Sequence, residues 1–391
     1  MHTGDEHIDS DVHGTLNPKT GRNTAWESNY ATIRHLAEQA VERRVDAFIS
    51  AGDEFKTGRP SQEALLMLAD AYTPLAEAGI PVLFLDGNHN RIGVTSGHRS
   101  AIWALAEILR ARGGVAEASA EPELVEVGGI QVATLPWLNK NVVLGAEAMS
   151  PAEGDRKVAD WALSKLEELA ATADAGAPLI MAGHVTVARL TASNDEGTRR
   201  GSERELTHLF SEPILDVAKL EALPFSYGAL GHIHTPQAVG AGVYQYAGSP
   251  NRLTFTDEPD IKGGNLVRLD AGRASFERVT TPARDMVTVD LTRTDEVPEI
   301  PEGALVRFLL APGDTDLSKD LRAAVTKQGA TVVQTKARPI QKMVVERPTL
   351  TQTVSGEEAL RTWAKNYSLL DADTLVTAAH NLTIREQETV R

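Results

Sequence analysis

Six short segments spread along the chain carry the residue types that bind divalent metal ions. They are Asp5-Glu6-His7, Gly52-Asp53, Gly87-Asn88-His89, Gly183-His184, Gly231-His232-Ile233-His234 and Tyr246-Ala247-Gly248-Ser249-Pro250. Carboxylate, amide and imidazole groups are ligands of Mn²⁺, iron and Zn²⁺. Such a set, scattered over the sequence but gathered in space, indicates a two-metal centre that hydrolyses phosphate esters.

The spacing inside the segments suits metal binding. Residues two apart in an extended backbone point to the same side, so Asp5 and His7 can reach one cation. The same holds for His232 and His234. Asp53 follows a short apolar run and a glycine, and a carboxylate has two oxygens with which to bridge two cations about 3.5–4 Å apart.

The remaining segments complete the set. Asn88 offers a carbonyl oxygen and His184 a ring nitrogen. His89 stands beside a ligand, where it could donate a proton to a leaving oxygen or stabilise transition-state charge. A lone Asp-x-His or Gly-His is more often structural than catalytic. The specificity lies in the whole ordered set.

The elements that must hold these residues alternate between strand-like and helical patterns. Apolar runs at 47–51, 82–85, 179–182 and 227–230 each lead into one of the segments, and 124–127 and 130–135 are further strands. Helical patterns occupy 61–78 and 100–112, and another includes Ile33 and Leu36. This rhythm predicts an α/β layered fold with ligands at the carboxyl ends of strands. Strands at 243–246 and 266–269 lack intervening helices and predict an antiparallel flank.

Changes in the pattern of strand-like and helical segments predict three regions. Residues 1–281 form the predicted catalytic domain, and residues 282–350 a small α+β domain with strands at 286–291, 304–310 and 330–333 and a helix at 317–328. Residues 351–391 carry two amphipathic helical stripes. These helices would either pack on their own domain or dock a partner, and amphipathicity alone does not distinguish the two.

Composition sets limits on function. The chain has 391 residues, a net charge of −15 and no cysteine. Disulfides, cysteine-bound zinc and thiol catalysis are thereby excluded. The acidic balance argues against a phosphate-backbone binder, although bound cations would invert the local field. Seven basic residues between Lys319 and Arg347 form either a solvated face or a nucleic-acid surface, and charge alone favours the former. No apolar run approaches the length of a membrane span, and no secretory leader is evident.

The pattern resembles the calcineurin-like metallophosphoesterase superfamily and, within it, the SbcD and Mre-eleven nucleases. The narrower resemblance rests on the segments around the ligands: Gly52 to Ser61, Leu135-Pro136-Trp137-Leu138, Tyr246 to Pro250 with Phe255, and Lys262-Gly263-Gly264. It covers the predicted catalytic domain well, the small domain loosely and the tail only by position.

The resemblance implies a four-layer α/β/β/α sandwich, a small capping domain that orients DNA, and a C-terminal helical segment. It assigns one metal to Asp5, His7, Asp53 and His234, and the other to Asp53, Asn88, His184 and His232. His89 would be the catalytic histidine and Mn²⁺ the preferred ion. The implied activity is 3′-to-5′ double-strand exonuclease and single-strand or hairpin endonuclease, by a metal-activated water, in DNA repair and recombination.

The resemblance also implies partners. These are DNA, an SbcC-type coiled-coil ATPase docked on the C-terminal helices, and a second copy of the chain joined through helices 61–78 and 100–112. No membrane is involved, and a cytoplasmic location is expected. Lys56, Arg252 and His13 are the predicted substrate contacts, chosen for their position near the ligands.

Some residues depart from the family pattern. Glu6 stands where an aromatic is common, and Asn90 replaces the usual acid, which would weaken support for a ligand. Lys56 stands where archaeal relatives carry a histidine. Only four residues precede Asp5, so either the first strand is a stub or the true start lies upstream of Met1. A missing central strand would expose its neighbours' backbone groups.

Two other functions remain open at this stage. One is a phosphodiesterase or phosphatase of the same superfamily that acts on small molecules. Such an enzyme has less need of a capping domain and a docking tail. The other is an inactive scaffold for an ATPase, which the short first strand and Asn90 favour.

Overall fold

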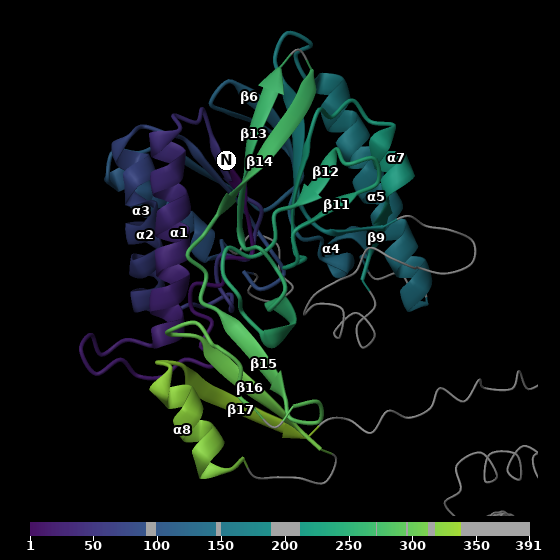
Figure 1. Cartoon of the computed structure of the whole chain (residues 1–391). Coiled ribbons are helices and arrows are strands. Elements are labelled where there is room, and N and C mark those ends of the chain that lie inside the picture. Colours follow the sequence, from purple (N-terminus) through teal and green to yellow (C-terminus); the bar gives the residue numbers. More distant parts are fainter. Residues whose placement is uncertain are drawn as a thin grey trace, which may run out of the picture. The chain divides into compact units, whose positions relative to one another are not determined.

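Two six-stranded sheets stack against each other in the described part of the catalytic region (Figure 1). The computed structural model describes residues 1–90, 99–145, 150–188, 212–270, 272–294, 296–311 and 317–337. The first sheet has the order β14 (Arg273–Thr280), β13 (Gly263–Asp270), β1 (His2–Thr3), β2 (Phe48–Ser50), β3 (Val82–Leu85) and β4 (Ala116–Ser119). The second has the order β11 (Gln237–Val239), β12 (Tyr244–Tyr246), β10 (Gly228–Gly231), β7 (Leu179–His184), β6 (Ile130–Leu135) and β5 (Leu124–Val127).

Alternating side chains separate the layers. On β2, Phe48 packs with the helices on the outer face of the first sheet, whereas Ile49 packs between the sheets. On β7, Met181 faces the second helical layer, whereas Ile180 faces the first sheet. This period of two follows from the pleat of a strand. The result is the predicted four-layer α/β/β/α sandwich.

Helices cover the two outer faces (Figure 1). α1 (Thr24–Glu42), α2 (Gln62–Glu77) and α3 (Ala101–Ala111) pack on the first sheet. α4 (Lys140–Leu144), α5 (Pro151–Thr172) and α7 (Val217–Glu221) lie with the second. α2 begins where the sequence predicts, because the Ser61 side chain accepts a hydrogen bond from the Ala64 amide. No described helix is long and apolar enough to cross a membrane.

The antiparallel flank predicted for strand 243–246 is found on one side of that strand only. β12 is antiparallel to β11 but parallel to β10. β11 lies at the edge of the sheet, and β12 turns back antiparallel to it into the position between β11 and β10. Two successive reversals therefore make β12 parallel to β10 without a crossover helix. The β13–β14 hairpin is antiparallel, as expected for the flank.

A three-stranded sheet follows the catalytic region. β15 (Met286–Asp290) is parallel to β16 (Leu305–Leu310), β17 (Thr331–Ala337) completes the sheet, and α8 (Lys319–Lys327) contributes Val325 to its core. Phe255, in the short helical turn η1 (Phe255–Asp257), packs on Met286 and Leu305. The domain boundary at 281 stays a prediction. Residues 351–391, predicted as helices, lie outside the described residues.

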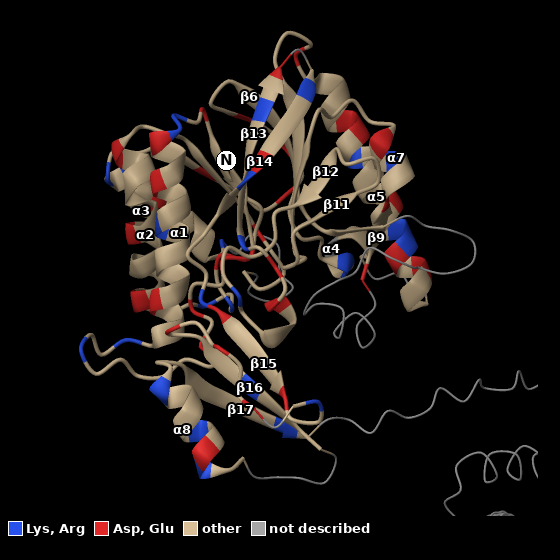
Figure 2. Ribbon diagram, in the orientation of Figure 1, with Lys and Arg blue, Asp and Glu red and all other residues tan. Residues whose placement is uncertain are grey.

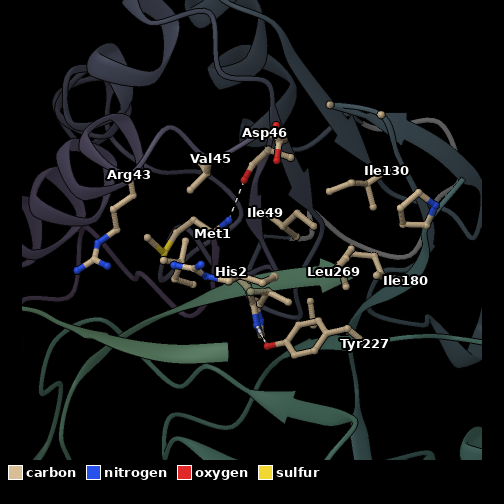
Figure 3. Close-up of a pocket in the computed structure, with 18 of the residues that line it drawn as sticks. Met1, His2, Arg43, Val45, Asp46, Ile49, Ile130, Ile180, Tyr227 and Leu269 are labelled. Carbon is tan, nitrogen blue, oxygen red and sulfur yellow. Dashed lines mark hydrogen bonds between the residues drawn. The ribbon is translucent and has the colours of Figure 1, made fainter. Parts of the chain in front are cut away.

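The central strand β1 is short and has a cavity beside it (Figure 3). His2 pairs with Asn265 of β13 and with Ile49 of β2. Beyond this pairing, a cavity of about 640 Å³ is lined by Val45–Ala47 on one side and Leu266–Leu269 on the other. The Met1 amino group donates a 2.8 Å hydrogen bond to the Ala47 carbonyl, and burial lowers its pKa to about 5. β1 thus spans 2 residues in this structure.

Candidate metal centre

The loops after β1 and β2 hold the first group of predicted ligands. The Asp5 amide donates to the Gly52 carbonyl at 2.8 Å, and the His7 amide to the Asp53 carbonyl at 3.0 Å. The two loops are thereby joined by their backbones. Asp5, His7 and Asp53 all have positive φ angles, of 56°, 40° and 60°. Residues other than glycine rarely adopt positive φ angles. This backbone conformation costs energy and is typical of functional loops.

Two glycines allow these loops to approach the rest of the site. Gly52 has φ 99°, and a Cβ atom there would lie 2.4 Å from His184 Nδ1. A Cβ at Gly87 would lie 2.0 Å from Asp53 Oδ1. The Gly-Asp and Gly-Asn-His motifs therefore need glycine because the ligands themselves occupy the space.

The second sheet supplies the remaining histidines. His184 ends β7, and its Nδ1 donates a 2.7 Å bond to the Ala51 carbonyl, because a carbonyl can only accept. His232 follows β10, and its amide donates to Asp5 Oδ1 at 2.9 Å. His184 therefore presents the lone pair of Nε2 when it is neutral. Both histidines reach across to loops of the first sheet.

The predicted ligands gather in two overlapping groups. His184 Nε2 lies 2.9 Å from Asn88 Oδ1 and 3.2 Å from Asp53 Oδ2. His232 Nδ1 lies 3.1 Å from the same Asn88 oxygen. In the other group, ligand atoms of Asp5, His7 and His234 lie within 4.8 Å of one another. The Asp53 carboxylate belongs to a similar cluster with Asp5 and His184.

Burial and mutual charge perturb these groups strongly. Burial raises the pKa of Asp5 well above its usual range and lowers the pKa of His7 well below it. Burial also lowers the pKa of His234 to about 3. For His184, burial acts in the same direction, but the Asp53 carboxylate outweighs it and raises the pKa to about 10. The Asp53 pKa is held below its usual range because His184, His7 and His89 together outweigh its burial. Unusual pKa values concentrated in one cluster are characteristic of functional sites.

The donor set fits divalent cations. Neither ring nitrogen of His7 has a hydrogen-bond partner among the described residues, although both nitrogens are buried. Buried polar atoms without partners are costly and call for an explanation. A neutral imidazole close to buried carboxylates is what a Mn²⁺ or Zn²⁺ site requires. The residues present therefore fit a metal group, whose identity they leave open.

His89 lies at the rim of the cluster. Its backbone amide donates to Asp53 Oδ1 at 2.8 Å, and its Nδ1 donates to the Lys56 carbonyl at 3.0 Å. Its ring lies edge-on to that of His7, with 5.0 Å between the centroids. The ring is half-buried, as Asn88 is, whereas the carboxylate and histidine ligands are buried. Nε2 is thus left to exchange a proton on the site side.

The two departures at positions 6 and 90 belong to one buried polar cluster. Ser50 Oγ lies 2.9 Å from a Glu6 oxygen and 2.7 Å from a Glu54 oxygen, and the Tyr72 hydroxyl donates to Glu6 at 2.9 Å. Burial raises the pKa of Glu6 to about 7. The Asn90 amide donates to Glu54. An acid at 90 would add a third carboxylate here, whereas asparagine donates a hydrogen bond to Glu54. The weaker support for a ligand stays a prediction.

The predicted substrate contacts are engaged in protein contacts. Lys56 Nζ pairs with Asp11 at 2.6 Å on the surface. The Arg252 guanidinium contacts the carbonyls of residues 260, 283 and 284 and the Asp285 carboxylate, and so joins the catalytic region to the small sheet. The His13 ring packs on Phe255 at 5.2 Å between centroids. None of these three appears in the metal-binding clusters found among the described residues.

Two residues near the ligands were missed by the sequence analysis. The Trp137 ring packs on His232 with 5.0 Å between the centroids. Trp137 lay in a segment noted for its resemblance, but no role was derived for it. Glu212 Oε2 lies 3.3 Å from His232 Nε2. No motif surrounds Glu212, so nothing local in the sequence points to it.

Comparison with known proteins agrees with this geometry. The family model for calcineurin-like phosphoesterases matches residues 1–236. The SbcD component of the SbcCD nuclease of Escherichia coli K12 is 24% identical over 307 residues, which cover 74% of this chain and 70% of that protein. The uncharacterized metallophosphoesterase YhaO of Bacillus subtilis is 35% identical over 94 residues, or 24% of this chain and 23% of that protein. With the fold, the ligand geometry and the family match in agreement, the chain belongs to the calcineurin-like phosphoesterases.

Proposed function

We propose that this chain is the nuclease component of an SbcCD-like complex and hydrolyses DNA phosphodiester bonds. The observation that carries the proposal is the convergence of seven ligand-type side chains from both sheets on one cluster. The similarity to the SbcD component of a nuclease over most of the chain supports DNA as the substrate. The proposed activities are 3′-to-5′ exonuclease on duplex ends and endonuclease on single strands and hairpins.

The ligand set would hold two divalent cations, with Mn²⁺ the proposed ion. Asp5, His7, Asp53 and His234 would hold one, and Asp53, Asn88, His184 and His232 the other. Bound there, the cations would polarise the phosphate and supply a nucleophilic water. The protein contributes a buried, backbone-joined pair of loops that keeps the ligand atoms in place without reorganisation.

His89 would move the proton. Its Nδ1–H donates to the Lys56 carbonyl and fixes the ring, so that the imidazolium form would carry on Nε2 the proton given to the leaving oxygen of the cleaved strand. Its amide bond to Asp53 keeps the ring close to the proposed bridging carboxylate. A histidine held in this way could also steady the charge that develops on the phosphate.

DNA contacts are proposed for the small sheet, which lies within the predicted capping domain of residues 282–350. In the described part of the basic stretch, four side chains are exposed: Lys319, Arg322, Lys327 and Lys336. Figure 2 shows blue segments on α8. Arg338, Lys342 and Arg347 continue this basic stretch outside the described residues. Lys56, Arg252 and His13 remain proposed contacts of lower rank, since each already has a protein partner.

Partners complete the proposal. The segment 351–391 would dock an SbcC-type ATPase, and α2 and α3 would join two copies of the chain. DNA repair and recombination in the cytoplasm is the proposed setting. The similarity to the SbcD protein, which belongs to an SbcCD complex, supports these assignments.

The test is hydrolysis of linear duplex and hairpin DNA in the presence of Mn²⁺. Wild type should degrade both, while His89→Gln and Asp53→Ala should lose at least about 100-fold in rate, as the loss of a positioned acid or of a metal ligand requires. His35→Gln, the same change on α1 away from the motifs, serves as the control and should match wild type. Equal degradation by wild type and both site variants would refute the assignment.

The same assay separates the alternatives. Hydrolysis of cyclic nucleotides or para-nitrophenyl phosphate esters without cleavage of DNA would identify a small-molecule phosphoesterase. Absence of any hydrolysis, together with absence of bound Mn²⁺ and retention of an ATPase partner, would identify a scaffold.

A further inference from the structure

Glu212 and Thr186 form a hydrogen-bonded pair beside the imidazole of His232, and neither belongs to the proposed ligand set. Thr186 Oγ1 donates a 2.8 Å bond to Glu212 Oε1. Glu212 Oε2 lies 3.3 Å from His232 Nε2, and the side chains of His232 and Glu212 are 3% and 11% exposed. In such a nearly dry environment, the carboxylate and the imidazole interact more strongly than they would in water.

The opposite nitrogen of the same ring faces the proposed metal ligands. His232 Nδ1 lies 3.1 Å from Asn88 Oδ1, which lies 2.9 Å from His184 Nε2. The Asn88 oxygen and the Glu212 carboxylate are both acceptors, so the metal-free ring can place a proton on either nitrogen. A cation bound at Nδ1 needs the lone pair of that nitrogen, and the ring proton is then on Nε2, the nitrogen 3.3 Å from Glu212.

The backbone holds Glu212 at this place. β8 (Thr186–Ala188) and β9 (Ile214–Asp216) are parallel neighbours, with Thr186 opposite Ile214. Thr186 is two residues beyond His184 and is 1% exposed. The strand pairing therefore ties the segment at Glu212 to the end of the ligand-bearing strand β7. Trp137 supports the His232 ring from another side.

We propose that Glu212, held by Thr186, is a positioning residue that fixes the tautomer and the plane of His232, so that Nδ1 faces a divalent cation. The inference rests on the proposed two-metal centre and assigns Glu212 to one of its two sites. Metal-bound histidines usually donate their other N–H to a carboxylate or carbonyl, and loss of that partner weakens metal binding about 10–100-fold.

The test titrates the metal-free full-length chain with Mn²⁺ by calorimetry. Wild type should bind two ions, and Glu212→Ala should weaken one of them about 10–100-fold while the other stays within about twofold. Glu212→Gln, which keeps one acceptor oxygen, and Thr186→Val, which removes only the anchor, should show smaller losses at the same ion. Glu126→Ala removes an exposed carboxylate on β5 and is the control, with both affinities unchanged.

Two other outcomes overturn the inference. If Glu212→Ala leaves both affinities unchanged, Glu212 does not position His232. If it weakens both ions equally and lowers the melting temperature of the metal-free protein in step, the role is merely structural. Should Glu212→Ala fail to fold, the Gln and Thr186→Val variants decide the matter by the same criteria. Wild type that binds two Mn²⁺ ions but leaves DNA intact would refute the proposed function while the inference stands.

Discussion

The buried amino group of Met1 makes a prediction that can be worked out in full. The pKa of this group falls from 8.0 to about 5 on folding because it loses water. Between pH 5 and pH 8, the amino group is therefore protonated in the unfolded chain but not in the folded chain. Above pH 8 neither state is protonated and the folded state bears no cost. Below pH 5 both are protonated, and the whole cost of burying the charge, about 4 kcal/mol, is present.

The perturbation is a three-residue extension, Met-Thr-Val, before Met1. It converts the amine to an uncharged amide that can still donate to the Ala47 carbonyl. The register of β1 against β13 places the added valine opposite Val267, with its side chain on the same side as His2, between the sheets. The cost removed is about 2.7 kcal/mol at pH 6 and about 0.2 kcal/mol at pH 8.5.

The assay is urea denaturation of the metal-free proteins, followed by tryptophan fluorescence at several pH values. The extended chain should exceed wild type in unfolding free energy by about 2.5 kcal/mol more at pH 6 than at pH 8.5. A Met-Gly-Gly extension is the matched control for packing, since it removes the charge without adding an apolar side chain. Its free energy of unfolding should show the same difference between pH 6 and pH 8.5. The part of the gain that does not depend on pH should be smaller. The reasoning would be refuted if the free energy of unfolding changed with pH in the same way for all three proteins.

Three further predictions concern the site and its supports. Gly87→Ala should abolish tight Mn²⁺ binding in calorimetry, because its Cβ would lie 2.0 Å from Asp53 Oδ1, whereas Gly176→Ala meets only Asp174 at 3.4 Å and should bind normally; normal binding by both would contradict the packing argument. Asn90→Asp should lower the unfolding free energy by about 1–3 kcal/mol, because Glu54 loses a donor and gains a like charge; unchanged urea midpoints would count against this reading of the cluster. Arg252→Ala should lower the free energy of unfolding by about 1–3 kcal/mol, because its contacts to residues 283–285 are lost. Urea denaturation measures this loss, with Arg268→Ala, which removes an arginine on β13, as the control. Slower DNA cleavage at unchanged stability would instead make Arg252 a substrate contact.

Much of the fold could be predicted because local signals agreed with tertiary structure. The run Val82–Leu85 is buried on both faces of its strand, and Pro60, Ser61 and Gly79 mark the ends of α2. α5 was missed, although Ser150 and Glu153 form a capping box with Pro151 at the first turn. That signal was present in the sequence and was overlooked. β14 was missed as well, because its charged and mostly exposed residues lack a strong apolar alternation.

The site could be predicted as far as its motifs extend. Seven ligand residues and His89 stand in short motifs whose glycines have a steric purpose, so residue type and spacing suffice to nominate them. Glu212 stands alone in sequence and meets His232 only through the pairing of β8 with β9. The polar cluster around Glu6 was similarly hidden, because position 6 and position 90 look like separate departures until the fold brings Glu54 between them.

The division of the ligands between two sheets has a consequence for biosynthesis. More than half of this chain separates Asp5 and His7 from His232 and His234, so the ribosome releases the first pair long before the second. Domains fold as units once their sequence is available. A nascent chain that ends before residue 232 thus holds Asp5 and His7 without the last two proposed ligands, and it cannot complete the set. The proposed metal binding would therefore begin only after His234 has been made, and a product terminated earlier would lack a complete site.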